Sequence, residues 1–115
     1  GIERQHDLVE VARERLKRLG YDNVAIVEGD GTIGWPAEAP YDAILAAASG
    51  SHVPPPLLDQ LAPDGRLVMP LGSSGAVQQL VKVTRRGDGS TARENLGAVR
   101  FVLLIGEEGW SDARR

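Results

Sequence analysis

The sequence predicts an α/β fold with a mixed sheet, in which parallel strands are followed by an antiparallel carboxyl-terminal end. Three observations favour this class. A strand end, an amphipathic helix and an apolar strand follow one another over residues 1–28, which is typical of a crossover between parallel strands. A second apolar strand is expected over residues 41–48. The last strands have short links, which favour antiparallel pairing.

The amino-terminal elements make up the expected crossover. Residues 1–4 look like the last residues of a strand, and apolar residues then recur at helical spacing over 7–19. Asp7 is the expected N-cap of this helix, and Gly20 stands where a helix end favours a left-handed residue. The apolar, largely β-branched run 24–27 predicts a short strand that is buried on both faces.

The remaining elements follow a loop over 29–40 that is rich in Gly and Pro. We expect the buried strand 41–48, a short helix over 57–61, a turn at 63–65, strands over 66–71 and 77–84, a turn at 86–90 and a final apolar strand over 99–105. Residues 105–115 are expected to be a frayed tail, apart from Trp110, so residues 1–115 form one partial domain.

Composition excludes several classes of function. The chain has 115 residues, enough for one domain, and its 42% hydrophobic and 25% charged residues are typical of a soluble globular protein. A net charge of −3 gives no reason to expect nucleic acid or an acidic membrane as a partner. The absence of cysteine excludes disulfides and fits a cytoplasmic protein. Two histidines make no metal signature, and no apolar run reaches the ~18 residues of a membrane span.

Two acids follow the ends of neighbouring parallel strands. An acid in the position of Glu3, after the second strand of a nucleotide-binding fold, accepts hydrogen bonds from both hydroxyls of a ribose. Asp30 is placed to accept from the exocyclic amine of a purine, and Gly31 lets the ring approach the backbone. These residues predict an adenosine site, without separating a nicotinamide cofactor from S-adenosylmethionine. The other reading of Asp30 is that it merely caps a turn.

Several segments resemble the protein-L-isoaspartate O-methyltransferase family, in order and over nearly the whole chain. They are IER (2–4), LKRLGYDNV (16–24), GDGTIGWP (29–36), APYDAI (39–44), LDQLAPDGRLV (58–68) and VRFV (99–102). The resemblance implies an incomplete Rossmann-like S-adenosylmethionine-dependent methyltransferase fold. It also implies methyl transfer from S-adenosyl-L-methionine to the free carboxylate of L-isoaspartyl residues, in the repair of damaged proteins.

The resemblance assigns roles to individual residues. Glu3 matches the acid that holds the cofactor ribose, and Asp30 with Gly31 matches the pair at the adenine. The segment 99–102 matches the part that lines the substrate peptide, which makes Phe101 and Val102 candidate substrate-binding residues. No catalytic acid or base and no metal is expected, because the isoaspartyl carboxylate is already ionised at neutral pH.

The chain also departs from the family pattern. Asp64 stands where a glycine is usual, and Leu103 stands where proline is usual, at the substrate edge. The match covers the carboxyl-terminal two-thirds of the family pattern, so the amino-terminal third with its glycine-rich cofactor loop is expected to be missing. An opening at Gly1 fits a processed chain or an internal fragment. The expected partners are isoaspartyl proteins or peptides, and the truncated chain is expected to self-associate.

Three other interpretations stay open at this point. A small-molecule methyltransferase would share Glu3 and Asp30 but lack the peptide-lining end. A nicotinamide enzyme would use Glu3 similarly, although no hydride-transfer site is visible. An inactive truncated remnant would act only by association.

Overall fold

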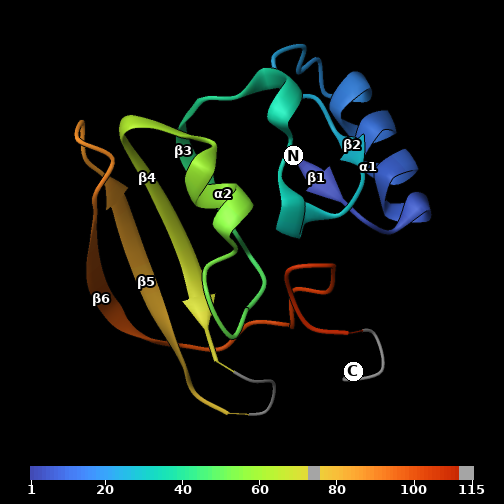
Figure 1. Ribbon diagram of the computed structural model, residues 1–115. Helices are drawn as coiled ribbons and strands as arrows, with labels where there is room; N and C mark the ends of the chain where they lie inside the picture. The colour runs from blue at the N-terminus through green and yellow to red at the C-terminus, as the bar shows by residue number, and fades with distance from the viewer. Residues whose placement is uncertain (73–75, 112–115) are drawn as a thin grey trace. The chain divides into compact units, whose positions relative to one another are not determined.

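The computed structural model describes residues 1–72 and 76–111. The chain divides into two compact units, residues 1–31 and residues 32–115, called the first and the second unit here. Each unit carries its own sheet, with two strands in the first and four in the second (Figure 1).

The first unit is a strand–helix–strand arrangement. β1 (Ile2–Glu3) pairs in parallel with β2 (Val27–Glu28), and α1 (His6–Arg18) connects them. The predicted parallel pair is therefore confirmed. Gly20, just past the helix, has a φ of 81°, as expected for a left-handed helix end. The predicted N-cap is wrong, because Gln5 occupies that position and Asp7 lies in the first turn, where its charge favours the helix dipole.

The strand predicted over 24–27 is shorter and more exposed than expected. Only Val27 and Glu28 are strand residues, and Val24 keeps 44% of its surface exposed. The prediction of burial on both faces is therefore wrong. A parallel strand becomes fully buried only between neighbouring strands and helices on both faces, whereas β2 has one strand partner and α1.

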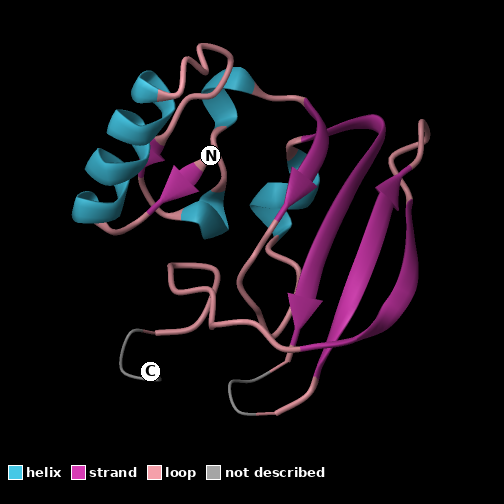
Figure 2. Ribbon diagram, turned by 180° about the vertical axis from the view of Figure 1, so that it is seen from behind, coloured by secondary structure: helices cyan, strands magenta, loops and turns pink. Residues whose placement is uncertain are grey.

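The second unit holds a mixed sheet with the strand order β3-β4-β5-β6 (Figure 2). Its elements are β3 (Tyr41–Leu45), α2 (Pro55–Asp59), β4 (Leu61–Leu71), β5 (Gln78–Arg85) and β6 (Thr91–Val99), preceded by the 3₁₀ helices η1 (Gly31–Ile33) and η2 (Pro36–Glu38). β3 and β4 run parallel, and β5 and β6 continue antiparallel. This confirms the predicted mixed sheet with an antiparallel end.

The core of the second unit lies on one face of this sheet, which α2 covers (Figure 1). Leu67 and Met69 of β4 and Val81 and Val83 of β5 are buried at alternate positions, so their side chains share a face. The rest of the cluster comes from α2 and its flanks: Val53, Leu57 and Leu61. β6, at the far edge, is mostly exposed.

Several predicted elements have different bounds, and the strand predicted over 66–71 belongs to the longer β4. The buried strand 41–48 is wrong, since β3 ends at Leu45, which is 81% exposed, while its neighbour Ile44 packs against the core on the other face of the sheet. The short helix begins at Pro55, where proline suits a first helical turn. The final strand is β6, not 99–105. An exposed edge strand needs no apolar face. The polar residues of β6 therefore gave no apolar pattern from which this strand could be predicted.

The turn predicted at 63–65 is wrong, because these residues lie inside β4, where the register with β3 shifts between Leu61 and Arg66. Asp64 lies in this irregular stretch of the strand. Asp64 has a φ of 65°, a left-handed conformation that Asp adopts more readily than most residues and that glycine adopts freely. The neighbouring Gly65 is more restricted, because a β carbon there would lie 2.8 Å from the carbonyl oxygen of Ala62 and 2.9 Å from that of Tyr41. The departure at Asp64 therefore leaves this part of β4 intact.

The segment expected to fray contains a hydrogen-bonded turn. The backbone N–H of Gly106 donates to the carbonyl of Trp110 (3.1 Å), and that of Trp110 donates to the carbonyl of Leu104 (2.8 Å). The indole Nε1–H of Trp110 also donates to the carbonyl of Ser49 (3.1 Å). Residues 112–115 of the predicted tail lie outside the described residues.

Candidate functional site

Glu3 lies at the carboxyl end of β1. The backbone N–H of Gly29 donates to the Glu3 carbonyl (3.0 Å), which fixes this strand end against the chain that follows β2. The Glu3 carboxylate accepts one hydrogen bond through Oε1, from the backbone N–H of Gln5 (3.2 Å). An ionised carboxylate has about four lone-pair sites. The half-buried Glu3 side chain is thus oriented by its own loop and keeps acceptor capacity for a ligand's hydroxyls.

Asp30 and Gly31 follow β2 at the same edge of this sheet. Because Gly29 pairs with Glu3, Asp30 lies one residue past the last hydrogen bond that joins the two strand ends. A β carbon built on Gly31 would meet no atom within 4 Å, so the space above this backbone is open. The structure therefore brings Glu3 and Asp30 to one strand-end edge, with open space at the backbone of Gly31.

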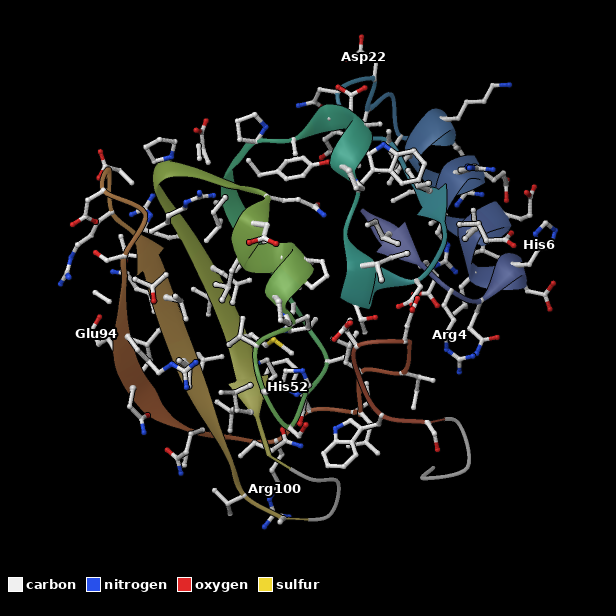
Figure 3. All side chains as sticks on the ribbon, viewed as in Figure 1. Arg4, His6, Asp22, His52, Glu94 and Arg100 are labelled. Atoms are coloured by element: carbon white, nitrogen blue, oxygen red, sulfur yellow. The ribbon has the colours of Figure 1, made fainter. Side chains whose placement is uncertain are left out.

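His6 and Glu28 form a pair at this edge that sequence reasoning missed. Nδ1 of His6, at the start of α1 (Figure 3), lies 2.5 Å from Oε1 of Glu28 at the end of β2. The hydrogen bond that His6 donates to the Glu28 carboxylate, and then the charge of that carboxylate, raise the pKa of His6 above the ordinary value. The partners are 22 residues apart in sequence, so no local pattern could have shown the pair.

We expect an NMR pH titration to place the pKa of His6 above the ordinary value of about 6.5, and Glu28→Gln to lower it. A raised pKa means that the pair stabilises the fold at pH below the ordinary value, and that this contribution is lost as pH rises through the raised value. Glu14→Gln is the matched control, because Glu14 pairs with Arg18 on α1. An unchanged His6 titration in the Glu28→Gln protein would contradict the assignment.

Phe101 and Val102 lie on an extended segment that pairs with Ser49, four residues past β3. The backbone N–H of Ser49 donates to the carbonyl of Val102 (2.6 Å), and the N–H of Leu104 donates to the carbonyl of Ser49 (2.7 Å). Phe101 is 39% exposed and Val102 is 69% exposed, while Ser49 is buried. A fixed backbone thus presents two apolar side chains near the carboxyl end of a parallel strand, where α/β sheets bind ligands.

The departure at Leu103 leaves this pairing unchanged. In the parallel bridge between Ser49 and Leu103, the hydrogen bonds run to the neighbours of Leu103. The N–H of Leu103 is not part of this pair, so a proline, which lacks that N–H, would cost no hydrogen bond to Ser49.

Glu3, Asp30 and Gly31 belong to the part of the chain up to residue 31, and Phe101 and Val102 belong to the second unit. Among the described residues, no group of three His, Cys, Asp or Glu side chains could hold a metal ion. Within that described part of the chain, no helix has both the length and the apolar character that crossing a membrane requires.

The family model for protein-L-isoaspartate(D-aspartate) O-methyltransferase matches residues 1–109. The chain belongs to this family. Among curated relatives, protein-L-isoaspartate O-methyltransferase 2 of Pelobacter propionicus is 52% identical over 109 residues, covering 95% of this chain and 48% of the relative. The Pyrococcus horikoshii enzyme of this family is 47% identical over 111 residues, which cover 96% of this chain and 50% of that relative. The chain thus spans about half the length of these relatives, less than the two-thirds that the resemblance implied.

Solved structures of protein-L-isoaspartate O-methyltransferases share this fold. One matches with a TM-score of 0.84 at 28% identity, covering 94% of this chain and 34% of that one. A second is a Plasmodium falciparum protein, described as a beta-aspartate methyltransferase and solved with S-adenosyl-L-homocysteine. It matches with a TM-score of 0.76 at 32% identity, and the match covers 91% of this chain and 51% of that one. They confirm the predicted Rossmann-like methyltransferase fold.

Proposed function

We propose that this chain takes part in methyl transfer from S-adenosyl-L-methionine to the free carboxylate of L-isoaspartyl residues in damaged proteins. The observation that carries the proposal is the family match over residues 1–109. The arrangement of Glu3 and Asp30 at one strand-end edge supports it, because an adenosine group is bound at such an edge in open α/β sheets.

In this proposal the chain's first unit binds the adenosine part of the cofactor. Glu3 accepts hydrogen bonds from the ribose hydroxyls, and Asp30 accepts from the adenine amine beside Gly31. The open space at Gly31 and the remaining acceptor capacity of Glu3 fit this group. The bound cofactor supplies a methyl group carried on a sulfonium.

The second unit contributes the peptide edge at Phe101 and Val102. Because the acceptor carboxylate is ionised at neutral pH, no side chain of this chain has to remove a proton. The chain's part is to bind, to align the two reactants and to keep water away, and these effects supply most of the acceleration in such a reaction. A cysteine-free sequence with a net charge of −3 supports action on proteins in the cytoplasm, without nucleic acid or a membrane as partner.

We expect Glu3→Ala and Asp30→Ala each to weaken S-adenosyl-L-homocysteine binding by about 1.5–3 kcal/mol, the contribution of a hydrogen bond to an ionised group. The measurement is isothermal calorimetry on a full-length protein that carries this chain. Glu14→Ala, which removes an acid paired with Arg18 on α1, is the control and should bind normally. Unchanged affinity in both test variants would reject the cofactor assignment.

A further inference from the structure

Gln78 is a buried polar side chain that the proposed chemistry does not use. It is the first residue of β5 and only 1% exposed. Its side-chain amide makes two hydrogen bonds to one residue outside the sheet. Nε2 donates to the carbonyl of Phe101 (3.0 Å), and the backbone N–H of Phe101 donates to Oε1 (2.6 Å).

The position of Gln78 explains why a side chain makes these bonds. The ladder between β5 and β6 ends with Gln78 opposite Val99. In that antiparallel register a backbone partner for Phe101 would stand at residue 76, before β5 begins. A side-chain amide has the donor and acceptor of a peptide group. Gln78 therefore extends the ladder by one step, where the backbone of β5 cannot.

Gly72 lies beside the Gln78 side chain and, because it has no β carbon, leaves space for it. Gly72 has a φ of 138°, and a β carbon built on it would lie 3.0 Å from the Cγ atom of Gln78. A larger residue at this place would press on the side chain that holds Phe101.

We propose that Gln78 is a positioning residue for peptide recognition, which fixes the backbone of Phe101 and Val102 so that their exposed side chains meet an isoaspartyl peptide in one geometry. This inference rests on the proposed function. Two anchors hold the segment, Gln78 at Phe101 and Ser49 at Val102. An isoaspartyl residue differs from aspartate in the path of its backbone, and a surface that reads such a difference has to keep its own backbone fixed.

The test uses a full-length protein that carries this chain, with the variants Gln78→Met and Gln78→Glu. Methionine keeps the length of the side chain and loses both bonds. Glutamate keeps the acceptor for the N–H of Phe101 but sets a carboxylate against its carbonyl. Gln79→Met is the matched control, because Gln79 is exposed and contacts Asn95 rather than Phe101.

We expect Gln78→Met to raise KM for an isoaspartyl peptide about tenfold, the combined effect of two ordinary hydrogen bonds. Gln78→Glu should raise it at least as much, because its buried carboxylate faces the Phe101 carbonyl, while kcat and S-adenosyl-L-homocysteine affinity stay within about twofold of the unchanged protein. An unchanged KM in Gln78→Met, or an equal loss of cofactor affinity in both Gln78 variants, would overturn the proposal.

Hydrogen exchange at the amide of Phe101 separates this inference from the proposed function, since it needs no substrate. The Phe101 amide should exchange faster in Gln78→Met and normally in Gln79→Met. Absence of isoaspartyl methylation by the unchanged protein would reject the proposed function and, with it, the recognition role. Normal methylation with unchanged exchange in Gln78→Met would reject only the role of Gln78.

Discussion

A full-length protein that carries this chain is expected to methylate an isoaspartyl peptide and to leave its aspartyl isomer at background. The two isomers differ by one methylene, which is moved between the side chain and the backbone. A methylene difference alone changes recognition by up to about 200-fold. In the wrong isomer the carboxylate also loses its alignment with the methyl donor. Methyl incorporation into two peptides of the same sequence, one of each isomer, measures the difference directly.

Two variants connect this selectivity with the peptide edge. Val102→Ala removes part of an exposed apolar side chain while the hydrogen bond from Ser49 to its carbonyl is kept. It should raise KM for the isoaspartyl peptide. Val77→Ala removes the same atoms from an exposed side chain outside the strands and serves as the control. Equal incorporation into both isomers would refute peptide selectivity, and preference for a free small molecule would favour a small-molecule methyltransferase.

The 115-residue chain studied by itself is expected not to persist as a compact, active monomer. The reason is that each unit has a strand edge open to pairing. In the first unit, Gly1 and Glu3 pair with the chain around β2, so the backbone N–H and C=O of Ile2 point away from it. In the second unit, β3 is an edge strand with the exposed Leu45. Such edges are sites for pairing with another chain.

The energies involved are comparable with the stability of a domain. An unpaired backbone group costs about 1–3 kcal/mol when it is buried, and a whole domain is stable by only about 5–15 kcal/mol. A two-stranded sheet is marginal by itself, and within α1 only Val9 is buried. We therefore expect the chain either to associate through its strand edges or to leave residues 1–31 partly molten, with weak cofactor binding or none.

Sedimentation velocity, thermal unfolding and a methyl-transfer assay on this chain test the expectation. If β3 is the edge that pairs, Leu45→Lys should reduce association, because a lysine on an edge strand opposes pairing. Val77→Lys adds the same charge outside the strands and should leave association unchanged. A single cooperative unfolding transition of a monomer, together with turnover, would contradict the expectation.

The parts of this fold that follow local rules could be predicted from the sequence. The helical spacing of α1, the glycine at its end and the short links of the last strands each depend on neighbouring residues. The apolar run 99–105 misled the prediction of the last strand, because β6 has polar residues and is exposed. The pairs His6–Glu28 and Gln78–Phe101 join residues more than twenty positions apart. Their distances depend on the assembled fold, which the local pattern does not contain.

Ser49 gives the peptide edge a capacity to vary. It holds Val102 and Leu104 only through their backbone groups, and its own hydroxyl donates to the carbonyl of Gly72. No side chain at position 102 or 104 takes part in these bonds. The exposed side chain at position 102 can therefore change during evolution, from aliphatic to aromatic or polar, while the path of its backbone is inherited unchanged.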